Sequence, residues 1–362
     1  MNRAKSKKKG GAVVRGNGET IVSAKPKEIV TSLLSGLPER SRLVLESRFG
    51  LGKTGERQTL ESIGRHYGIT RERVRQIENH AIALVHKSPS FALAQEVFDE
   101  LERHIGKLGG VVCEEDLLAY LSKDEIIQNY IYFLLVLGDP FKYRKEDDEA
   151  QRCWYVDPSL AKNVENALAN LYAGLSDKDL IPESEMVDRF LKGLKDVNDE
   201  FRNAEITRRW LAISKKIAKN PLGEWGLADS PNIKTKGVRD YAYLAVKKHG
   251  SPLHFTEVAD MISKIFGRST HIATTHNELI KDERFVLVGR GMYALREWGY
   301  ASGVVRDVIK KVLRDNGPMT REDVIDKVLK ERHVKPGTVI VNLQNPKYFK
   351  KGKDGKWSVV KA

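Results

Sequence analysis

The sequence of 362 residues is poor in the features that mark secreted, membrane and metal proteins. Its two cysteines, Cys113 and Cys153, form no CxxC pair, so we expect neither a disulfide framework nor a zinc site. The longest strongly apolar run, 130–137, is far too short to cross a bilayer. The first residues lack the apolar core of a secretion signal. These absences favour a cytoplasmic protein with reduced thiols and no membrane segment.

Motifs for catalysis or cofactor binding are also missing. The histidines at 249, 254, 271 and 276 lie close in sequence, but none pairs with another at i,i+4 beside a carboxylate, so we expect no metal. The segment 50–54 contains a glycine-lysine-threonine run, yet it lacks the first glycine of a phosphate loop and follows no strand. No nucleophile motif occurs. The sequence therefore predicts no cofactor, no small-molecule ligand and no enzymatic activity.

The net charge of +13 is distributed unevenly. Residues 1–27 carry +7, residues 28–90 carry +3, residues 91–300 carry −5 and residues 301–362 carry +8. Basic surfaces attract nucleic acid, and an acidic stretch does not. The pattern predicts nucleic-acid contacts near the ends of the chain and protein contacts in the middle.

The segment 59–86 predicts two short helices joined by a turn. Thr59 and Thr70 are suited to cap the two helices, and Gly68-Ile69-Thr70 interrupts the helical pattern between them. In the second helix an apolar stripe recurs at steps of three and four residues, formed by Val74, Ile77, Ala81 and Leu84. This pattern is typical of a helix-turn-helix unit.

The face opposite the stripe carries side chains that can read bases. Arginine can bond guanine, glutamine can bond adenine, and glutamate can accept from the cytosine amino group. These residue types lie near the start of the second helix, where helix-turn-helix proteins contact bases. The candidate base-reading residues are Arg71, Glu72, Arg75 and Gln76.

The same residues carry a resemblance. The segments 37–50, 59–64 and 70–78 resemble region 4 of the sigma-70 transcription initiation factors, over about residues 28–89. The resemblance implies a trihelical domain that binds promoter DNA at a −35-like element and the flap of RNA polymerase. It also implies phosphate contacts by Arg48, Arg73 and Asn79 and by the backbone of Thr59, Leu60 and Glu61, with Arg75 suited to either role. The alternative is a trihelical fold kept for protein contacts, its charges a solvated face.

The residues before this domain are rich in lysine and glycine. Residues 1–27 show no apolar period, so we expect a disordered basic arm that follows DNA phosphates or only aids solubility. We also expect no further sigma-like domain in so short a segment. The region 4-like part would then be a free-standing module joined to a different C-terminal portion.

That C-terminal portion predicts a repeat. Three segments, 223–227, 291–295 and 355–359, share one pattern: a glycine, any residue, a large aromatic residue, any residue and an aliphatic residue. A weaker copy without the glycine lies at 153–156. The aromatics Trp154, Trp225, Tyr293 and Trp357 are separated by 71, 68 and 64 residues. Such spacing points to a string of small domains. We expect each aromatic on the second strand of a hairpin, facing its own core.

Each copy reads as three helices followed by a hairpin, which is the plan of a winged helix. Residues 236–300 resemble winged helices of the HARE type, as in the delta subunit of RNA polymerase. The predicted fold is therefore mainly α: a trihelical helix-turn-helix domain followed by winged-helix domains with β-hairpin wings. The expected divisions are 1–27, 28–90, 91–157, 158–231, 232–300 and 301–362.

The combined interpretation is a non-catalytic bacterial transcription protein that binds double-stranded promoter DNA and RNA polymerase. Two alternatives remain open. One is a polymerase accessory subunit of delta type without sequence-specific DNA binding. The other is a component of a nucleic-acid-processing enzyme, suggested only by the HARE resemblance.

Overall fold

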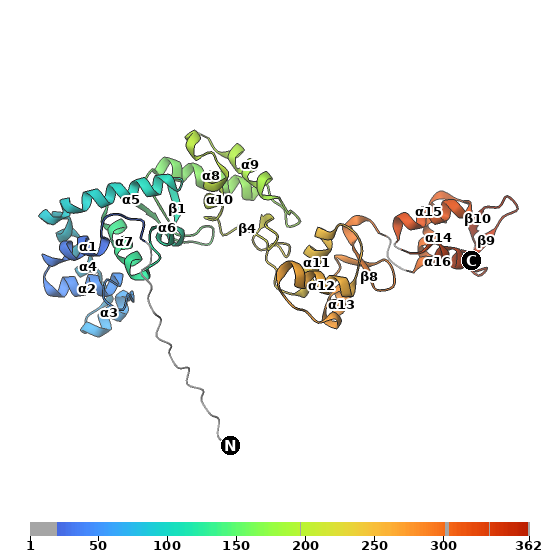
Figure 1. Ribbon diagram of the computed structural model, residues 1–362, viewed down its shortest axis with the longest axis horizontal. Coiled ribbons are helices and arrows are strands. Elements are labelled where there is room, and N and C mark those ends of the chain that lie inside the picture. Colours follow the sequence, from blue (N-terminus) through green and yellow to red (C-terminus); the bar gives the residue numbers. More distant parts are fainter. Residues whose placement is uncertain (1–19, 196, 301–303, 333, 361–362) are drawn as a thin grey trace, which may run out of the picture. The chain divides into compact units, whose positions relative to one another are not determined.

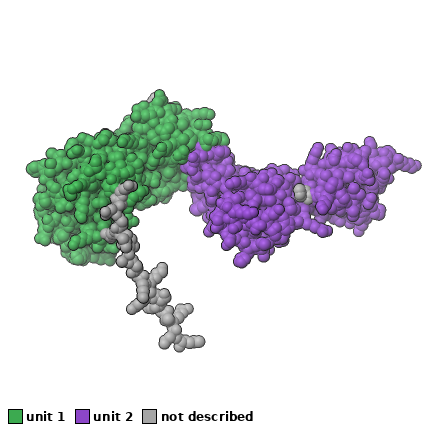
Figure 2. Space-filling view, viewed as in Figure 1, with its two compact units in different colours: residues 1–174, 184–217 green, residues 175–183, 218–362 purple. Residues whose placement is uncertain are grey.

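The computed structural model describes residues 20–195, 197–300, 304–332 and 334–360. It is mainly helical, with small antiparallel sheets (Figure 1). The chain divides into two compact units (Figure 2). Unit 1 comprises residues 1–174 and 184–217, and unit 2 comprises residues 175–183 and 218–362. This division runs through the segment 158–231, which the sequence predicted as a domain of its own.

The first part of unit 1 contains four α-helices. Pro26 begins the first helix, Gly50 and Gly68 follow the second and the third, and Thr59 and Thr70 cap the third and the fourth. The helices are α1 (Pro26–Ser35), α2 (Glu39–Phe49), α3 (Leu60–Tyr67) and α4 (Arg71–Lys87), followed by the 3₁₀ helix η1 (Pro89–Ala94). The two helices predicted within 59–86 are thus confirmed as α3 and α4.

Four successive stretches then repeat one order of elements: helix, short extended segment, two helices, two strands. The first contains α5 (Gln95–Lys107), β1 (Val111–Cys113), α6 (Glu114–Leu121), α7 (Glu125–Leu137), β2 (Lys142–Arg144) and β3 (Cys153–Tyr155). The second contains α8 (Pro158–Ala173), α9 (Glu183–Gly193), η2 (Asp199–Phe201), α10 (Ala204–Leu211), β4 (Ile217–Lys219) and β5 (Trp225–Leu227). We call these repeats 1 and 2.

Repeats 3 and 4 follow the same order. Repeat 3 contains α11 (Val238–His249), β6 (Leu253–His254), α12 (Phe255–Phe266), α13 (Ile272–Lys281), β7 (Phe285–Leu287), β8 (Met292–Leu295) and η3 (Arg296–Trp298). Repeat 4 contains α14 (Val305–Asn316), α15 (Arg321–Glu331), α16 (Pro336–Leu343), β9 (Phe349–Lys351) and β10 (Trp357–Val359). The helix-and-hairpin order predicted from the sequence is confirmed.

The four aromatics occupy one structural position. Each aromatic lies on the last strand of its repeat. Its backbone pairs with a residue of the extended segment that precedes the second helix of the same repeat. Glycines two residues before the aromatic in repeats 2, 3 and 4 have φ of 84°, 69° and 79°, conformations that side chains rarely adopt. The cross-strand pairs are Trp154 with Val112, Trp225 with Ile181, Tyr293 with Leu253, and Trp357 with Met319.

Three of these aromatics are buried and the fourth is half-buried. Trp154, Trp225 and Tyr293 are at most 5% exposed, whereas Trp357 is of intermediate exposure and packs at the edge of the repeat 4 core. The sequence predicted all four on second strands facing their cores. The placement is confirmed, and the degree of burial at Trp357 is lower than in the other copies.

The two cysteines lie opposite each other in the sheet of repeat 1. Cys113 on β1 and Cys153 on β3 are register partners, and both thiols are free and buried. Burial raises the pKa of Cys113 to about 12 and that of Cys153 to about 11. Because the thiolate is the reactive form, both side chains behave as small apolar groups at neutral pH.

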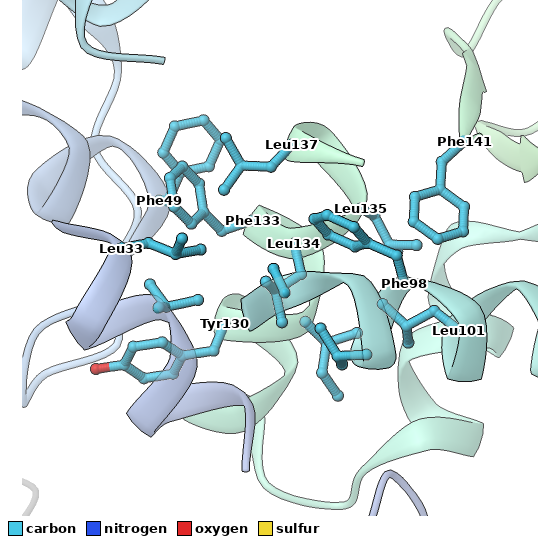
Figure 3. Packing of buried hydrophobic residues seen from close by; sticks show 14 of the residues in the cluster. Leu33, Phe49, Phe98, Leu101, Tyr130, Phe133, Leu134, Leu135, Leu137 and Phe141 are labelled. Carbon is cyan, nitrogen blue, oxygen red and sulfur yellow. The ribbon is translucent and has the colours of Figure 1, made fainter. Parts of the chain in front are cut away.

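The large apolar core of unit 1 crosses an expected domain boundary. Helix α7 packs against α1 and α2 on one side and α5 on the other, and its apolar side chains join those of the trihelical part (Figure 3). Phe49 of α2 lies 4.8 Å, centroid to centroid, from Phe133 of α7. Trp154 of β3 belongs to the same core. Residues 28–90 therefore do not form a core separate from 91–157.

The expected arm also ends earlier than residue 27. Val22 is 4% exposed and belongs to the unit 1 core. The backbone N–H of Ile21 donates to Leu121, and the N–H and hydroxyl of Ser23 donate to the buried carboxylate of Glu100 at 2.8 and 2.6 Å. Residues 20–27 are thus part of the folded unit. The rest of the predicted arm, 1–19, lies outside the described residues.

No helix in the described part of the chain combines the length and apolar character required to cross a membrane.

The repeat predicts a local effect of losing its aromatic. Trp357→Ala should destabilise repeat 4 by about 2–3 kcal/mol, less than full truncation of a buried tryptophan because Trp357 is half-buried. Hydrogen exchange resolved by segment should show faster exchange within 305–359 and unchanged exchange in α3 and α4. Equal acceleration in both regions would contradict an independent repeat 4 core.

Candidate nucleic-acid interface

The helix-turn-helix formed by α3 and α4 begins each helix with a threonine cap. The Thr59 hydroxyl accepts from the backbone N–H of Ser62, and the Thr70 hydroxyl accepts from that of Arg73, both at 3.1 Å. Such caps satisfy backbone donors that a helix start leaves unpaired. The caps fix where α4 begins, and so which of its residues lie in its first exposed turn.

Two glycines shape the turn between the helices. Gly68 ends α3 with φ of 63°, a left-handed conformation that favours glycine. A Cβ placed on Gly64 would lie 2.7 Å from the carbonyl oxygen of Ile69, which is backbone and cannot move aside easily. The absence of a side chain at Gly64 therefore permits the close approach of α3 to the turn.

A small apolar core joins α2, α3 and α4. Val44, Ile63 and Val74 are fully buried, one from each helix. Ile77 of the predicted stripe packs against this core, and Ala81 and Leu84 continue the stripe into the large core of unit 1. The apolar face of α4 thus packs into two cores, the small one and the large one, and the opposite face of the helix remains exposed.

That exposed face carries the candidate base-reading residues, and two of them are paired. Glu72 accepts two hydrogen bonds from Arg75, at 2.9 and 2.6 Å. The hydrogen bonds from Arg75 lower the pKa of Glu72, and the same contact raises the pKa of Arg75. Both side chains are more than half exposed, so solvent screens the attraction between them. Breaking this ion pair to contact a base would therefore cost little free energy.

The remaining members of the face differ in their contacts. A guanidinium N–H of Arg73 donates to the Gln76 side-chain oxygen at 3.0 Å. Arg71 and Asn79 are exposed, and among the described residues neither side chain makes a hydrogen bond or ion pair. The structure thus gathers the predicted residues on one accessible face of α4.

Arg48 of α2 has a different environment from the one expected of a free phosphate ligand. Its Nε lies 3.4 Å from a carboxylate oxygen of Glu78, and its NH1 donates to the Gln58 carbonyl at 3.2 Å. Burial raises the pKa of Glu78, whose side chain is 13% exposed. Arg48 therefore ties α2 to α4 and to the segment before α3. Glu78 was not among the predicted site residues; its signal in the sequence is its place one turn after Val74, at the edge of the apolar stripe.

The start of α3 presents its backbone rather than its side chains. The Thr59 hydroxyl is occupied as a cap, and Leu60 packs against the small core. The exposed Glu61 carboxylate lies 3.8 Å from Arg65. Since a carboxylate repels phosphate, any phosphate contact here would use the first amide groups of the helix.

A polar contact from α7 holds the loop between α2 and α3. The Asn129 amide nitrogen donates to the carbonyls of Gly50 and Gly55 at 3.1 and 2.8 Å, and its oxygen accepts from Arg57 Nε at 2.6 Å. The Tyr130 hydroxyl donates to the Leu51 carbonyl. The loop between α2 and α3 is therefore fixed by a helix of repeat 1.

Residues 33–85 match the family described as Sigma-70, region 4. The chain is 45% identical over 62 residues to the RNA polymerase sigma factor RpoD of Helicobacter pylori, and 48% identical over 56 residues to the sigma factor SigA of Listeria monocytogenes. It is 33% identical over 64 residues to the principal sigma factor HrdD of Streptomyces griseus. These matches span 16–18% of this chain and 9–19% of the relatives.

A sigma-70 region 4 domain therefore lies at residues 33–85. The match covers α2, α3 and nearly all of α4, together with the last residues of α1. Repeats 1 to 4 lie beyond the matched residues. The similarity thus concerns the helix-turn-helix and not the four-fold repeat.

The close approach at Gly64 can be tested by one methyl group. Gly64→Ala should destabilise unit 1 by about 1–3 kcal/mol, because the new Cβ overlaps the Ile69 carbonyl oxygen. Gly36→Ala is the matched control, since nothing lies within 4 Å of a Cβ there and φ is −81°. Denaturant unfolding of both variants measures the difference. Equal stability of the two variants would show that the turn relaxes freely.

Proposed function

We propose that this protein is a non-catalytic, cytoplasmic transcription protein of bacteria that recognises promoter DNA through α4 and contacts RNA polymerase. One observation carries the proposal. The first two turns of α4 expose arginine, glutamate and glutamine on one face while the other face is held in two apolar cores. A helix fixed in this way can lie in a major groove with no change in its packing against the rest of the domain.

Base reading assigns Arg71, Glu72, Arg75 and Gln76 to base edges. Arg71 makes no side-chain hydrogen bond or ion pair among the described residues, so it can approach guanine directly. Glu72 and Arg75 already form a pair that can turn as a unit toward a C·G base pair, one accepting and the other donating. Gln76 exchanges its contact with Arg73 for an adenine, which frees Arg73 for a phosphate.

Phosphate contacts frame this face. Arg73 and Asn79 flank the base-reading residues on α4, and the amides of Thr59, Leu60 and Glu61 lie at the start of α3. Glu78 and the Gln58 carbonyl hold the guanidinium of Arg48, so Arg48 positions α2, α4 and the segment before α3. Its partly exposed side chain adds positive charge near the phosphates.

The polymerase contact follows from the names of the relatives, which are RNA polymerase sigma factors. We assign the flap of the core enzyme as the partner of the region 4 domain. Helix α7 already covers much of the apolar surface of α1 and α2. The polymerase contact would therefore use the exposed remainder, such as Leu43 of α2, which is 36% exposed.

The repeats support a second candidate function. Their element order is that of winged helices, and we assign the HARE type to repeat 3, as in the delta subunit of polymerase. On this alternative the protein is an accessory subunit without sequence-specific DNA binding. Binding to polymerase in the absence of DNA, together with no preference among duplexes, would favour the accessory role.

The base-reading proposal predicts a loss that depends on sequence. Arg71→Ala and Gln76→Ala should each weaken binding to a selected duplex by about 1–3 kcal/mol and relax the choice of bases. Arg103→Ala and Gln95→Ala remove the same exposed residue types from α5 and should leave binding unchanged. Affinity selection from a random library followed by binding titrations measures both effects. Equal losses on selected and random duplexes would contradict base reading.

The basic segment 1–19 predicts an effect that is independent of sequence. Deleting it removes six lysines and arginines and should flatten the salt dependence of DNA binding by about 0.9 for each phosphate that the segment had neutralised. The deletion should stop at residue 19, because Val22 and Ser23 belong to the fold of unit 1. An unchanged salt slope would show that the segment does not touch DNA.

A further inference from the structure

We propose that repeat 4 holds a second, sequence-independent DNA-binding surface on its hairpin, and that the hairpins of repeats 1 to 3 do not share this role. The surface consists of the exposed lysines at 350, 351, 353 and 356 on and between β9 and β10; we call it the lysine hairpin. It contacts the phosphates of duplex DNA. This inference does not depend on base reading by α4.

The lysine hairpin has positive charge without internal compensation. None of its four lysines forms an ion pair among the described residues. Asp354 is its one acidic residue, and a carboxylate oxygen of Asp354 accepts from the backbone N–H of Lys356 at 3.2 Å. Unpaired cations on a two-stranded hairpin are suited to a partner with regularly spaced negative charge.

A second group of cations gathers around Tyr348, next to β9. Arg306 lies 4.6 Å, Lys310 4.4 Å and Lys347 5.7 Å from the centre of the Tyr348 ring. Arg306 pairs with Asp307, whereas the two lysines have no carboxylate partner among the described residues. Like charges this close repel one another, so an anion beside the ring would be stabilising. The basic surface therefore continues from the hairpin to α14.

The equivalent hairpins of the other repeats lack such a surface. In repeat 1 the segment between β2 and β3 contains four consecutive acidic residues, 146–149, of which Glu146 pairs with Lys215 and Asp147 with Arg144. In repeat 2 Lys219 pairs with Glu183. The segment between β7 and β8 of repeat 3 carries Arg290 as its one charged residue. Counted over both strands and the segment between them, the repeat 1 hairpin has four basic and four acidic residues, whereas the repeat 4 hairpin has four basic residues and one acidic residue.

The third helix of repeat 4 explains why the contact would ignore sequence. Helix α16 exposes Val341, which is 70% exposed and cannot read a polar base edge specifically. The Asn342 amide is bound to the Thr338 carbonyl of the same helix at 2.8 Å. Lysine is a point charge suited to phosphate rather than a planar fork for guanine. Repeat 4 therefore adds affinity and not base preference.

The test compares three charge variants of the full chain on a random-sequence duplex. K350Q/K351Q/K353Q should reduce the slope of log affinity against log salt by up to about 2.7, from about 0.9 for each phosphate no longer neutralised. K350R/K351R/K353R keeps the charges and should keep the slope. K311Q/K327Q/K330Q removes three lysine charges from α14 and α15 and should change the slope little.

Three results would overturn the proposal. The first is an unchanged slope in the hairpin glutamine variant. The second is an equal decrease of the slope in the α14 and α15 control, which would reduce the effect to net charge. The third is that the hairpin variant loses binding to single-stranded RNA or to a polyglutamate peptide but still binds the duplex, which would assign a different partner. Thermal melting of each variant controls for folding. The hairpin variant should still prefer a selected duplex over a random one. Measuring this preference in parallel separates a failure of the lysine hairpin proposal from a failure of base reading by α4.

Discussion

The packing of α7 against the trihelical part is the interaction on which unit 1 depends. Phe133 of α7 meets Phe49 of α2, while Asn129 and Tyr130 of the same helix bond the loop that leads into α3. One helix therefore supplies both an apolar core and the hydrogen bonds of a loop with several glycines. Without these bonds, the buried carbonyl of Gly50 and that of Leu51 would lose their partners at considerable cost.

This arrangement has a consequence for the region 4 domain. A domain of about 60 residues has a small core and little stability of its own. Here its core is extended by repeat 1, so the orientation of α4 is supported by residues up to Trp154. Mutations of the buried side chains of α5 or α7 would therefore affect the proposed DNA binding through the position of α3 and α4, although they lie outside the matched segment 33–85.

The four repeats show how one architecture can carry different surfaces. The cross-strand pair between the aromatic and the preceding extended segment is kept, because it joins the hairpin to the helices from within. The charged side chains at the hairpin tips of repeats 1 and 4 are exposed and lie outside this pair, so they are free of this constraint. Repeat 1 places paired acidic residues there, and repeat 4 places unpaired lysines.

Local patterns in the sequence determined the elements. Threonine caps and glycine stops defined α3 and α4, and the period-two spacing of Trp357 and Val359 defined a strand, because these signals depend on neighbouring residues. The predicted exposure of Arg71, Glu72, Arg75 and Gln76 followed from the stripe on the other side of α4.

Only the tertiary structure decided which elements share a core and which charges are paired. The apolar run of α7 identified a buried helix, but nothing local to it indicated α1 and α2 as its neighbours. Likewise Val22 and Ser23 looked like the end of a polar arm, since their partners lie about 80 residues away at Glu100 and in the shared core. Arg48 was a free cation in the sequence and is a tether to Glu78 in the fold. Each depends on contacts between distant segments, which residue spacing does not encode.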